Sequence, residues 1–170
     1  MRAMNAETAP TRRKATVHLL CGLPGCGKTT FARRLAVERD AVILGHDEQM
    51  VARHGTNPPE EKFTTFAREI TEALWQEAAQ VVAHGRDVIL DWGFWTRAER
   101  DDARRRAAEM GADAMLYLVE CDDAVARART LARTEAGGCV LEINGAAWDV
   151  FRARFEPPTP DEAPVSSRSG

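Results

Sequence analysis

Residues 22–29 read Gly22-Leu23-Pro24-Gly25-Cys26-Gly27-Lys28-Thr29, a complete phosphate-binding loop of the form G-x-x-x-x-G-K-[ST]. The glycines of such a loop let the backbone turn tightly enough to aim several N–H groups at one anion. The lysine can reach the β- and γ-phosphates of a nucleotide, and the hydroxyl of Thr29 can bind Mg²⁺. We therefore predict a site for ATP and Mg²⁺, with nucleotide contacts at Gly22, Leu23, Pro24, Gly25, Cys26, Gly27, Lys28, Thr29 and Thr30.

The residues on either side of the loop fit this prediction. Residues 16–21 form an apolar run typical of a buried strand, and Phe31 and Leu35 lie one helical turn apart just after the loop. A helix that begins near Lys28 would add its positive N-terminal end to the phosphate site.

Composition limits the class of protein. The 170 residues are 44% hydrophobic and 29% charged, which suits one globular domain. The net charge of −3 argues against a general polyanion binder. No apolar run reaches membrane-spanning length and no signal peptide is visible. The four cysteines lack zinc-ligand spacing, so we expect a reduced, cytoplasmic protein.

Alternating patterns further along the chain predict the remaining elements. Apolar runs predict strands over residues 41–44, 87–91 and 115–119. Helical spacing predicts helices over residues 60–84, 96–110, from Asp122 onward, and 146–155, with a capping box at Thr96 and Glu99. This alternation predicts an α/β domain over residues 15–156, a parallel sheet with helices on both faces. We expect residues 1–14 to be a disordered start and residues 157–170 a Pro- and Ser-rich tail.

Parallel sheets bind ligands beyond the carboxyl ends of their strands. In this chain the rule places the phosphate loop, Asp47 after the second strand and Asp91 at the end of the third strand in one crevice. The guanine-reading Asn-Lys-x-Asp motif and the Asp-x-x-Gly switch motif are missing, and the chain has no length for the extra domains of a molecular motor. A kinase is the class that remains.

Phosphoryl transfer to an alcohol needs a metal, a charge clamp, an acceptor pocket and a group that orients the hydroxyl. We assign the metal to Thr29 and Asp91, although Asp91 could be a solvated strand terminus. Asp47 is the candidate base, and its alternative role is an N-cap of a short helix.

Arg129 and Arg133 share one helix face, which predicts a helical lid that clamps the phosphates, with a solvated basic face as the alternative. Arg127 points elsewhere. Trp92 and Trp95 are candidates for an acceptor pocket, or for core or lid packing.

These residues together resemble a group of small P-loop kinases that includes the polynucleotide 5′-kinase domain, chloramphenicol phosphotransferase and the zeta-toxin kinases. The resemblance covers most of residues 16–162 and rests on residues 22–30, Gly45-His46-Asp47, Val88-Ile89-Leu90-Asp91, Arg129-x-x-x-Arg133 and the ending Phe155-Glu156-Pro157 with Asp161-Glu162. It implies a P-loop NTPase fold, a general base at Asp47, lid arginines on the phosphates, and Asp91 beside the acceptor or the metal.

One residue departs from this resemblance. Polynucleotide kinases carry an arginine three residues after the base, where this chain has Met50. The sequence therefore favours an ATP- and Mg²⁺-dependent kinase that phosphorylates a hydroxyl of a small molecule. A 5′-hydroxyl nucleic-acid kinase and a nucleotide-binding regulatory protein with little turnover remain alternatives. The sequence names neither the acceptor nor the oligomeric state, and no membrane partner is expected.

Overall fold

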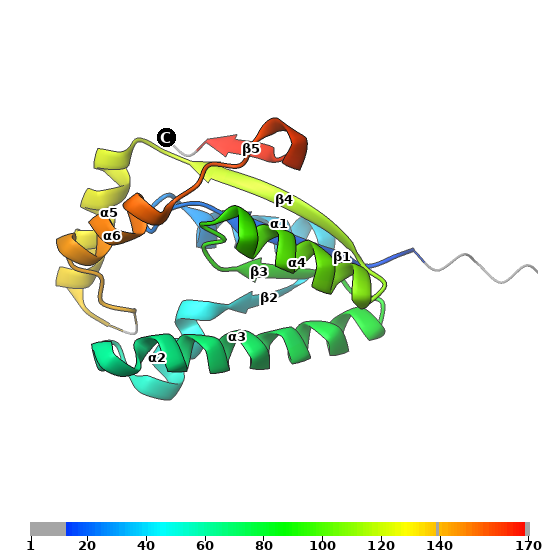
Figure 1. The fold of residues 1–170 in the computed structure, drawn as a ribbon, viewed down its shortest axis with the longest axis horizontal. Helices are drawn as coiled ribbons and strands as arrows, with labels where there is room; N and C mark the ends of the chain where they lie inside the picture. The colour runs from blue at the N-terminus through cyan, green and yellow to red at the C-terminus, as the bar shows by residue number, and fades with distance from the viewer. Residues whose placement is uncertain (1–12, 139, 169–170) are drawn as a thin grey trace, which may run out of the picture.

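The computed structural model describes residues 13–138 and 140–168. Its centre is a five-stranded sheet in the order β2-β3-β1-β4-β5, in which every neighbouring pair is parallel (Figure 1). The strands are β1 (Thr16–Cys21), β2 (Val42–Gly45), β3 (Val88–Asp91), β4 (Asp113–Glu120) and β5 (Val165–Arg168). The first four lie within two residues of the predicted runs, so the predicted α/β class is confirmed.

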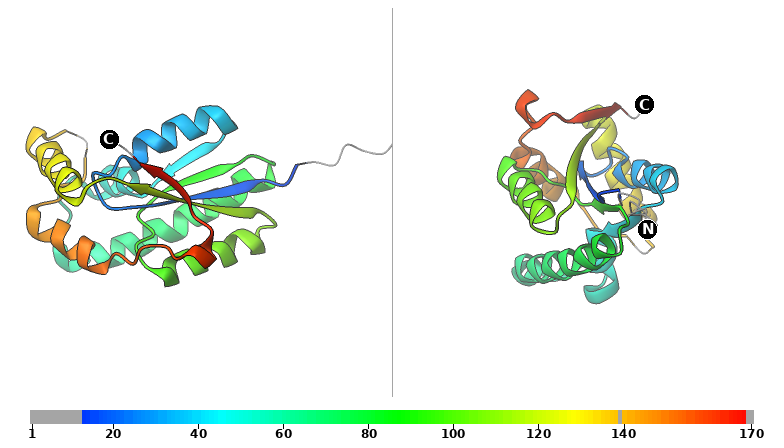
Figure 2. Two further views of the ribbon diagram at one scale, coloured as in Figure 1. Left: turned by 90° about the horizontal axis from the view of Figure 1, so that it is seen from above. Right: turned by 90° about the vertical axis from the view of Figure 1, so that its right-hand side faces the viewer.

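Helices cover both faces of this sheet, as predicted (Figure 2). On one face α1 (Lys28–Arg39) packs Ala32 and Leu35 against the central strands. On the other face lie α3 (Glu60–Ala83) and α4 (Arg97–Glu109), which bury the larger part of the core. The Thr96–Glu99 capping box at the start of α4 is present.

Three more helices lie toward the carboxyl ends of the strands. They are α2 (His46–His54), directly after β2, and the pair α5 (Asp123–Ala136) and α6 (Gly145–Arg154), which lie side by side at that end of the molecule (Figures 1 and 2). Asp122 caps α5 by accepting hydrogen bonds from the backbone N–H groups of Ala124 and Val125. These helices therefore surround the end of the sheet at which the phosphate loop lies.

Residues 157–170 were predicted to be a tail, and this prediction was wrong for most of residues 157–168, the part that the structure describes. Pro160–Glu162 form a 3₁₀ turn, and β5 extends the sheet beside β4. Two tertiary features decide this: β4 offers an unpaired edge, and the carboxylate of Glu162 is bound by buried Arg100 of α4. Neither feature can be predicted from the local Pro- and Ser-rich composition, because both depend on residues far away in the sequence.

The predicted disordered start lies mostly outside the described residues. Of the part that is described, Arg13 pairs with Asp87 at 2.9 Å and Lys14 pairs with Asp113 at 2.6 Å, so both are tied to the amino end of the sheet. Cys139 also lies outside the described residues. No helix in the described ranges is long and apolar enough to cross a bilayer.

Candidate active site

The phosphate loop has the tight backbone that its glycines predict. Gly25 and Gly27 have φ values of 83° and 97°, a region that favours glycine. A Cβ on Gly25 would lie 2.1 Å from the carbonyl oxygen of Ala126 on α5, so only glycine fits there. Helix α1 begins at Lys28 and its N-cap is Gly27, without a side-chain cap, which leaves its first N–H groups for an anion.

Lys28 is held inside the loop. Its Nζ donates to the carbonyl oxygens of Gly22 and Leu23, both at 2.9 Å. The ammonium group is therefore positioned within the concave side of the loop before any phosphate is bound. Pro24, Gly25, Gly27, Lys28, Thr29 and Thr30 line a cavity of about 550 Å³, whereas Leu23 and Cys26 are buried beneath the loop.

Two indoles support the loop from outside. Trp95 Nε1 donates to the carbonyl of Gly22 at 3.2 Å, and Trp148 Nε1 of α6 donates to the carbonyl of Pro24 at 3.2 Å. Trp148 is buried, and the sequence analysis missed it because a tryptophan on an apolar helix face gives no local sign of this distant partner. Trp95, predicted as an acceptor residue, both lines the cavity and holds the loop.

Thr29 and Asp91, the two residues predicted to hold a metal, are in direct contact. Thr29 Oγ1 donates to Asp91 Oδ2 at 2.7 Å. Burial raises the pKa of the Asp91 carboxyl above its ordinary value, while Lys28 and the Thr29 hydroxyl act to lower it. A hydroxyl and a carboxylate are hard oxygen donors that suit Mg²⁺, which usually keeps several waters and binds substrate phosphates. No cluster of three or more metal-binding side chains occurs among the described residues, so phosphate and water would have to complete the coordination.

Asp47 and Glu48 lie in the first turn of α2 and line the same cavity. The N-cap of this helix is Gly45, so the alternative role of Asp47 as an N-cap was wrong. Both carboxylates act to raise the pKa of Asp91, although burial is the main cause of that shift. Asp47 therefore lies on the same cavity as the Thr29–Asp91 pair.

Arg129 and Arg133 of α5 both line the cavity. Arg127 of the same helix instead pairs with Asp149 of α6 at 3.2 Å, which confirms that it points elsewhere. The middle of α5 is fixed, because Ala126 and Thr130 are buried beside Gly25 of the phosphate loop. Arg129 thus lies within the part of α5 that packs on the loop, and Arg133 lies one turn after it.

The far side of the cavity has an aromatic wall. Trp92 Nε1 donates to the carbonyl of Leu44 at 3.1 Å, and its ring packs against Phe94 and Trp75 with centroids 5.3 and 5.4 Å away. Trp92 thus packs on its neighbours and also lines the cavity, whereas its contact with an acceptor stays a prediction. Residues of α3 that the sequence analysis treated only as an apolar helix face complete this wall: Phe63, Ala67, Thr71 and Trp75.

Comparison with known proteins agrees with this geometry. A family model described as an AAA domain matches residues 17–158. The chain belongs to this AAA domain family. No curated protein sequence matches this chain.

Several solved structures share the fold of this AAA domain. A provisionally assigned kinase of Chloroflexus aurantiacus is 20% identical, with a TM-score of 0.73 over 91% of this chain and 88% of that one. A chain of the Pnkp1/Rnl/Hen1 RNA repair complex is 20% identical, with a TM-score of 0.71 over 85% of this chain and 45% of that one. Kti12 of Chaetomium thermophilum, in complex with ADP-AlF3, is 18% identical, with a TM-score of 0.69 over 89% and 88% of the two chains. This AAA domain thus has a kinase-like P-loop fold, which implies nucleotide binding.

Proposed function

We propose that this protein is an ATP- and Mg²⁺-dependent phosphotransferase that moves the γ-phosphate to a hydroxyl of a small molecule. One observation carries the proposal: the phosphate loop, the Thr29–Asp91 pair, the Asp47 carboxylate and two arginines all face one cavity. A site that only holds nucleotide has no need of a carboxylate beside the acceptor position.

Each group has a role in this reaction. Lys28 and the N–H groups of the loop bind the β- and γ-phosphates, and Thr29 and Asp91 would hold Mg²⁺, which when bound neutralises phosphate charge. The acceptor oxygen forms a bond to the γ-phosphorus while the bond to the β,γ-bridging oxygen breaks, and ADP leaves. Asp47 takes the proton of the hydroxyl. Arg129 and Arg133 stabilise the charge that develops on the transferred group.

The cavity wall favours a small acceptor over a nucleic-acid end. The acceptor-side residues from α2, α3 and the Trp92 segment include carboxylates and aromatic rings, but no lysine or arginine among those described as lining it. Met50, at the position where polynucleotide kinases carry an arginine, is fully buried in the core. One further cation of the lining is Arg154 of α6, which lies 5.8 Å from the centre of the Trp95 ring and pairs with Glu99 at 3.5 Å. A phosphorylated acceptor would therefore meet no lysine or arginine from α2, α3 or residues 92–95, and Arg154 already has a carboxylate partner.

A second candidate, a 5′-hydroxyl nucleic-acid kinase, is favoured by the structural similarity to a chain of the Pnkp1/Rnl/Hen1 complex. The likeness is one of fold. The two candidates differ in the charge of the acceptor, so one substrate panel separates them.

The test is a screen of purified protein with labelled ATP and Mg²⁺ against sugars, nucleosides, hydroxylated antibiotics and 5′-hydroxyl oligonucleotides. We expect transfer to a small uncharged or cationic alcohol. Asp47→Asn keeps the size of the side chain but removes the base, so it should leave ATP binding intact and lower transfer by about a hundredfold or more. The matched control is Asp40→Asn, at an exposed site outside the cavity lining.

Two outcomes decide against the proposal, and a third changes the residue assigned as the base. Transfer only to oligonucleotides would favour the second candidate. ATP binding without transfer to any acceptor would favour a regulatory protein. Unchanged transfer by Asp47→Asn would remove Asp47 from the chemistry and make Asp91 the next candidate for the base.

A further inference from the structure

Arg100 is a fully buried arginine with no part in the chemistry above. It is the fourth residue of α4, and its side chain is 1% exposed. Nε and Nη2 donate to the two carboxylate oxygens of Glu162 at 2.7 and 2.9 Å, and Nη1 donates to the carbonyls of Phe94 and Glu156 at 3.1 and 2.9 Å. One guanidinium thus joins three parts of the chain: α4, the segment after β3, and residues 156–162, here called the C-terminal segment.

The segment after β3, residues 92–95, has an unusual backbone. Phe94 has a φ of 45°, a left-handed conformation that a bulky residue keeps only where its surroundings impose it. Its carbonyl accepts from Arg100 and also from Cys21 Sγ at 3.3 Å. A Cβ on Gly93 would lie 2.2 Å from Trp95 Nε1, so the indole of Trp95 folds directly over that glycine. Arg100 is therefore one of the groups that hold this conformation.

The same segment is bonded to the start of the phosphate loop. The N–H of Gly22 donates to the carbonyl of Gly93 at 3.2 Å, and Trp95 Nε1 donates back to the carbonyl of Gly22. That carbonyl also accepts from Lys28. On its other side the segment is fixed by the C-terminal segment, because the N–H of Glu156 donates to the carbonyl of Trp95 at 2.7 Å.

We propose that Arg100 and Glu162 are positioning residues, which set the place of Trp95 and, through Gly22, the shape of the phosphate loop. This deepens the proposed function, since it assigns the C-terminal segment to the nucleotide site that the transfer reaction would use. These contacts connect two stretches that the sequence analysis considered separately, residues 91–95 and the ending at residues 155–162. Glu156 binds Trp95 directly, and Glu162 reaches Phe94 through Arg100.

The chemistry of the site requires an arginine. A planar guanidinium presents N–H groups in several fixed directions, so it can bind a carboxylate with two groups and reach two carbonyls with a third. A lysine at position 100 keeps the charge opposite Glu162 but has one nitrogen for all four acceptors. Arg100→Lys should therefore release the carbonyl of Phe94 while it keeps the buried charge paired.

The test is a double-mutant cycle on ATP·Mg binding, measured by calorimetry without any acceptor. Arg100→Lys and Trp95→Phe should each weaken ATP·Mg binding by about fivefold or more, a loss of the size of one hydrogen bond. If Arg100 acts through Trp95, the double variant should bind no more weakly than the weaker single variant. Thermal unfolding of each variant shows that it is folded at the temperature of the measurement.

Arg97→Lys is the matched control. Arg97 also joins α4 to the C-terminal segment, through Asp161 at 2.8 Å, Thr159 at 3.0 Å and a longer 3.7 Å pairing with Glu162. It is exposed, however, and none of these contacts reaches residues 92–95. The Arg97→Lys variant should therefore bind ATP·Mg with the affinity of the unaltered protein. If Arg100→Lys does not fold, Glu162→Gln takes its place in the cycle, because it keeps the shape of the partner but removes its charge.

The outcomes separate the two proposals. If the unaltered protein does not bind ATP·Mg, the proposed function fails. If it binds but a folded Arg100→Lys binds equally well, the positioning role is wrong and the ion pair only joins the C-terminal segment to α4. The positioning role is also wrong if the loss of ATP·Mg affinity in the double variant equals the product of the two single losses. That result would show that Arg100 and Trp95 act independently.

Discussion

At the scale of single residues, Lys28 shows how the site is prepared for its ligand. Its ammonium group is bound by two carbonyls of its own loop, and one of these carbonyls is also held by Trp95. Preorganised donors are worth more than mobile ones because no reorganisation is needed when charge arrives. The lysine is thus part of the shape of the loop as well as its charge.

Lys28→Ala removes this charge, so we expect ATP·Mg affinity to fall by about tenfold or more, as expected for loss of a charge-assisted contact. Calorimetry measures the affinity. Lys14→Ala is the control, since Lys14 forms an exposed ion pair with Asp113 and is absent from the cavity lining. Undiminished binding by Lys28→Ala would contradict the nucleotide site.

At the scale of elements, α5 is the part of the site that could respond to the nucleotide. It is anchored by Ala126 and Thr130 against the phosphate loop, and it ends at Ala136 before Gly137 and Gly138, both with positive φ. A closing movement would therefore be confined to the turns after Thr130, which carry Arg133.

Replacing Arg129 and Arg133 together with alanine should lower phosphate transfer by about a hundredfold or more, because a clamp that Arg133 completes on closure stabilises mainly the transition state. ATP affinity should change far less than turnover. Arg127→Ala, on the same helix but paired with Asp149, is the matched control. Equal losses in affinity and turnover would indicate a static contact with the nucleotide.

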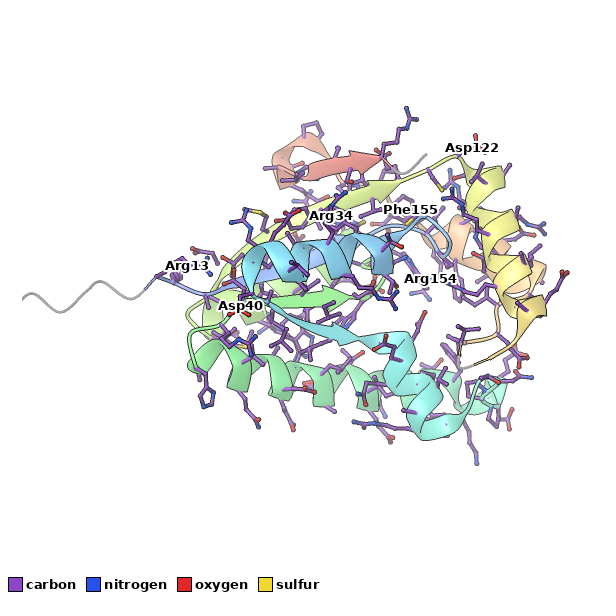
Figure 3. The ribbon with its side chains drawn as sticks, turned by 180° about the vertical axis from the view of Figure 1, so that it is seen from behind. Arg13, Arg34, Asp40, Asp122, Arg154 and Phe155 are labelled. Atoms are coloured by element: carbon purple, nitrogen blue, oxygen red, sulfur yellow. The ribbon has the colours of Figure 1, made fainter. Side chains whose placement is uncertain are left out.

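At the scale of the whole molecule, the two ends of the sheet differ in chemistry. The carboxyl end holds the site, whereas the amino end, where Arg13 lies (Figure 3), buries a polar network. His18 of β1 is 2% exposed and lies 3.4 Å from Asp87 and 3.1 Å from the hydroxyl of Tyr117. Burial lowers the pKa of His18 below its ordinary value of 6.5, although Asp87 acts to raise it, and Arg39 and Arg13 add to the lowering.

A histidine with a lowered pKa stays neutral in the folded protein after it has been protonated in the unfolded chain. The unfolded state then binds more protons, so the free energy of unfolding should fall as the pH drops below 6.5. The slope for this one group cannot exceed about 1.4 kcal/mol per pH unit. His18→Gln should flatten the curve between about pH 6.5 and 5, as followed by urea unfolding. The exposed control His84→Gln should keep the slope.

Glu162 should make the free energy of unfolding depend on pH in a more acidic range than His18 does. Hydrogen bonds from Arg100 lower the pKa of Glu162 from 4.5 to about 2. Its contribution to stability is complete above pH 4.5 and is lost as the pH falls toward 2, because protonation then breaks the buried pair. Glu162→Gln should therefore reduce the pH dependence of unfolding below pH 4.5, whereas a curve of unchanged shape would contradict this role.

The sequence by itself determined the parts of this protein that depend on near neighbours along the chain. The loop around Lys28, the capping box of Thr96 and Glu99, and the helical spacing of α3 involve residues within a few turns of one another. The placement of Asp47 and Asp91 in one cavity was also predictable, because the carboxyl ends of parallel strands share an edge.

The tertiary structure alone decided the supports of the site. Arg100 and Glu162 are 62 residues apart, Gly22 and Trp95 are 73 apart, and Pro24 and Trp148 are 124 apart. Local periodicity reports which residues are buried but not which donor meets which acceptor. For the same reason residues 165–168 read as part of a tail: four residues become a strand only because the edge of β4 offers them its N–H and carbonyl groups.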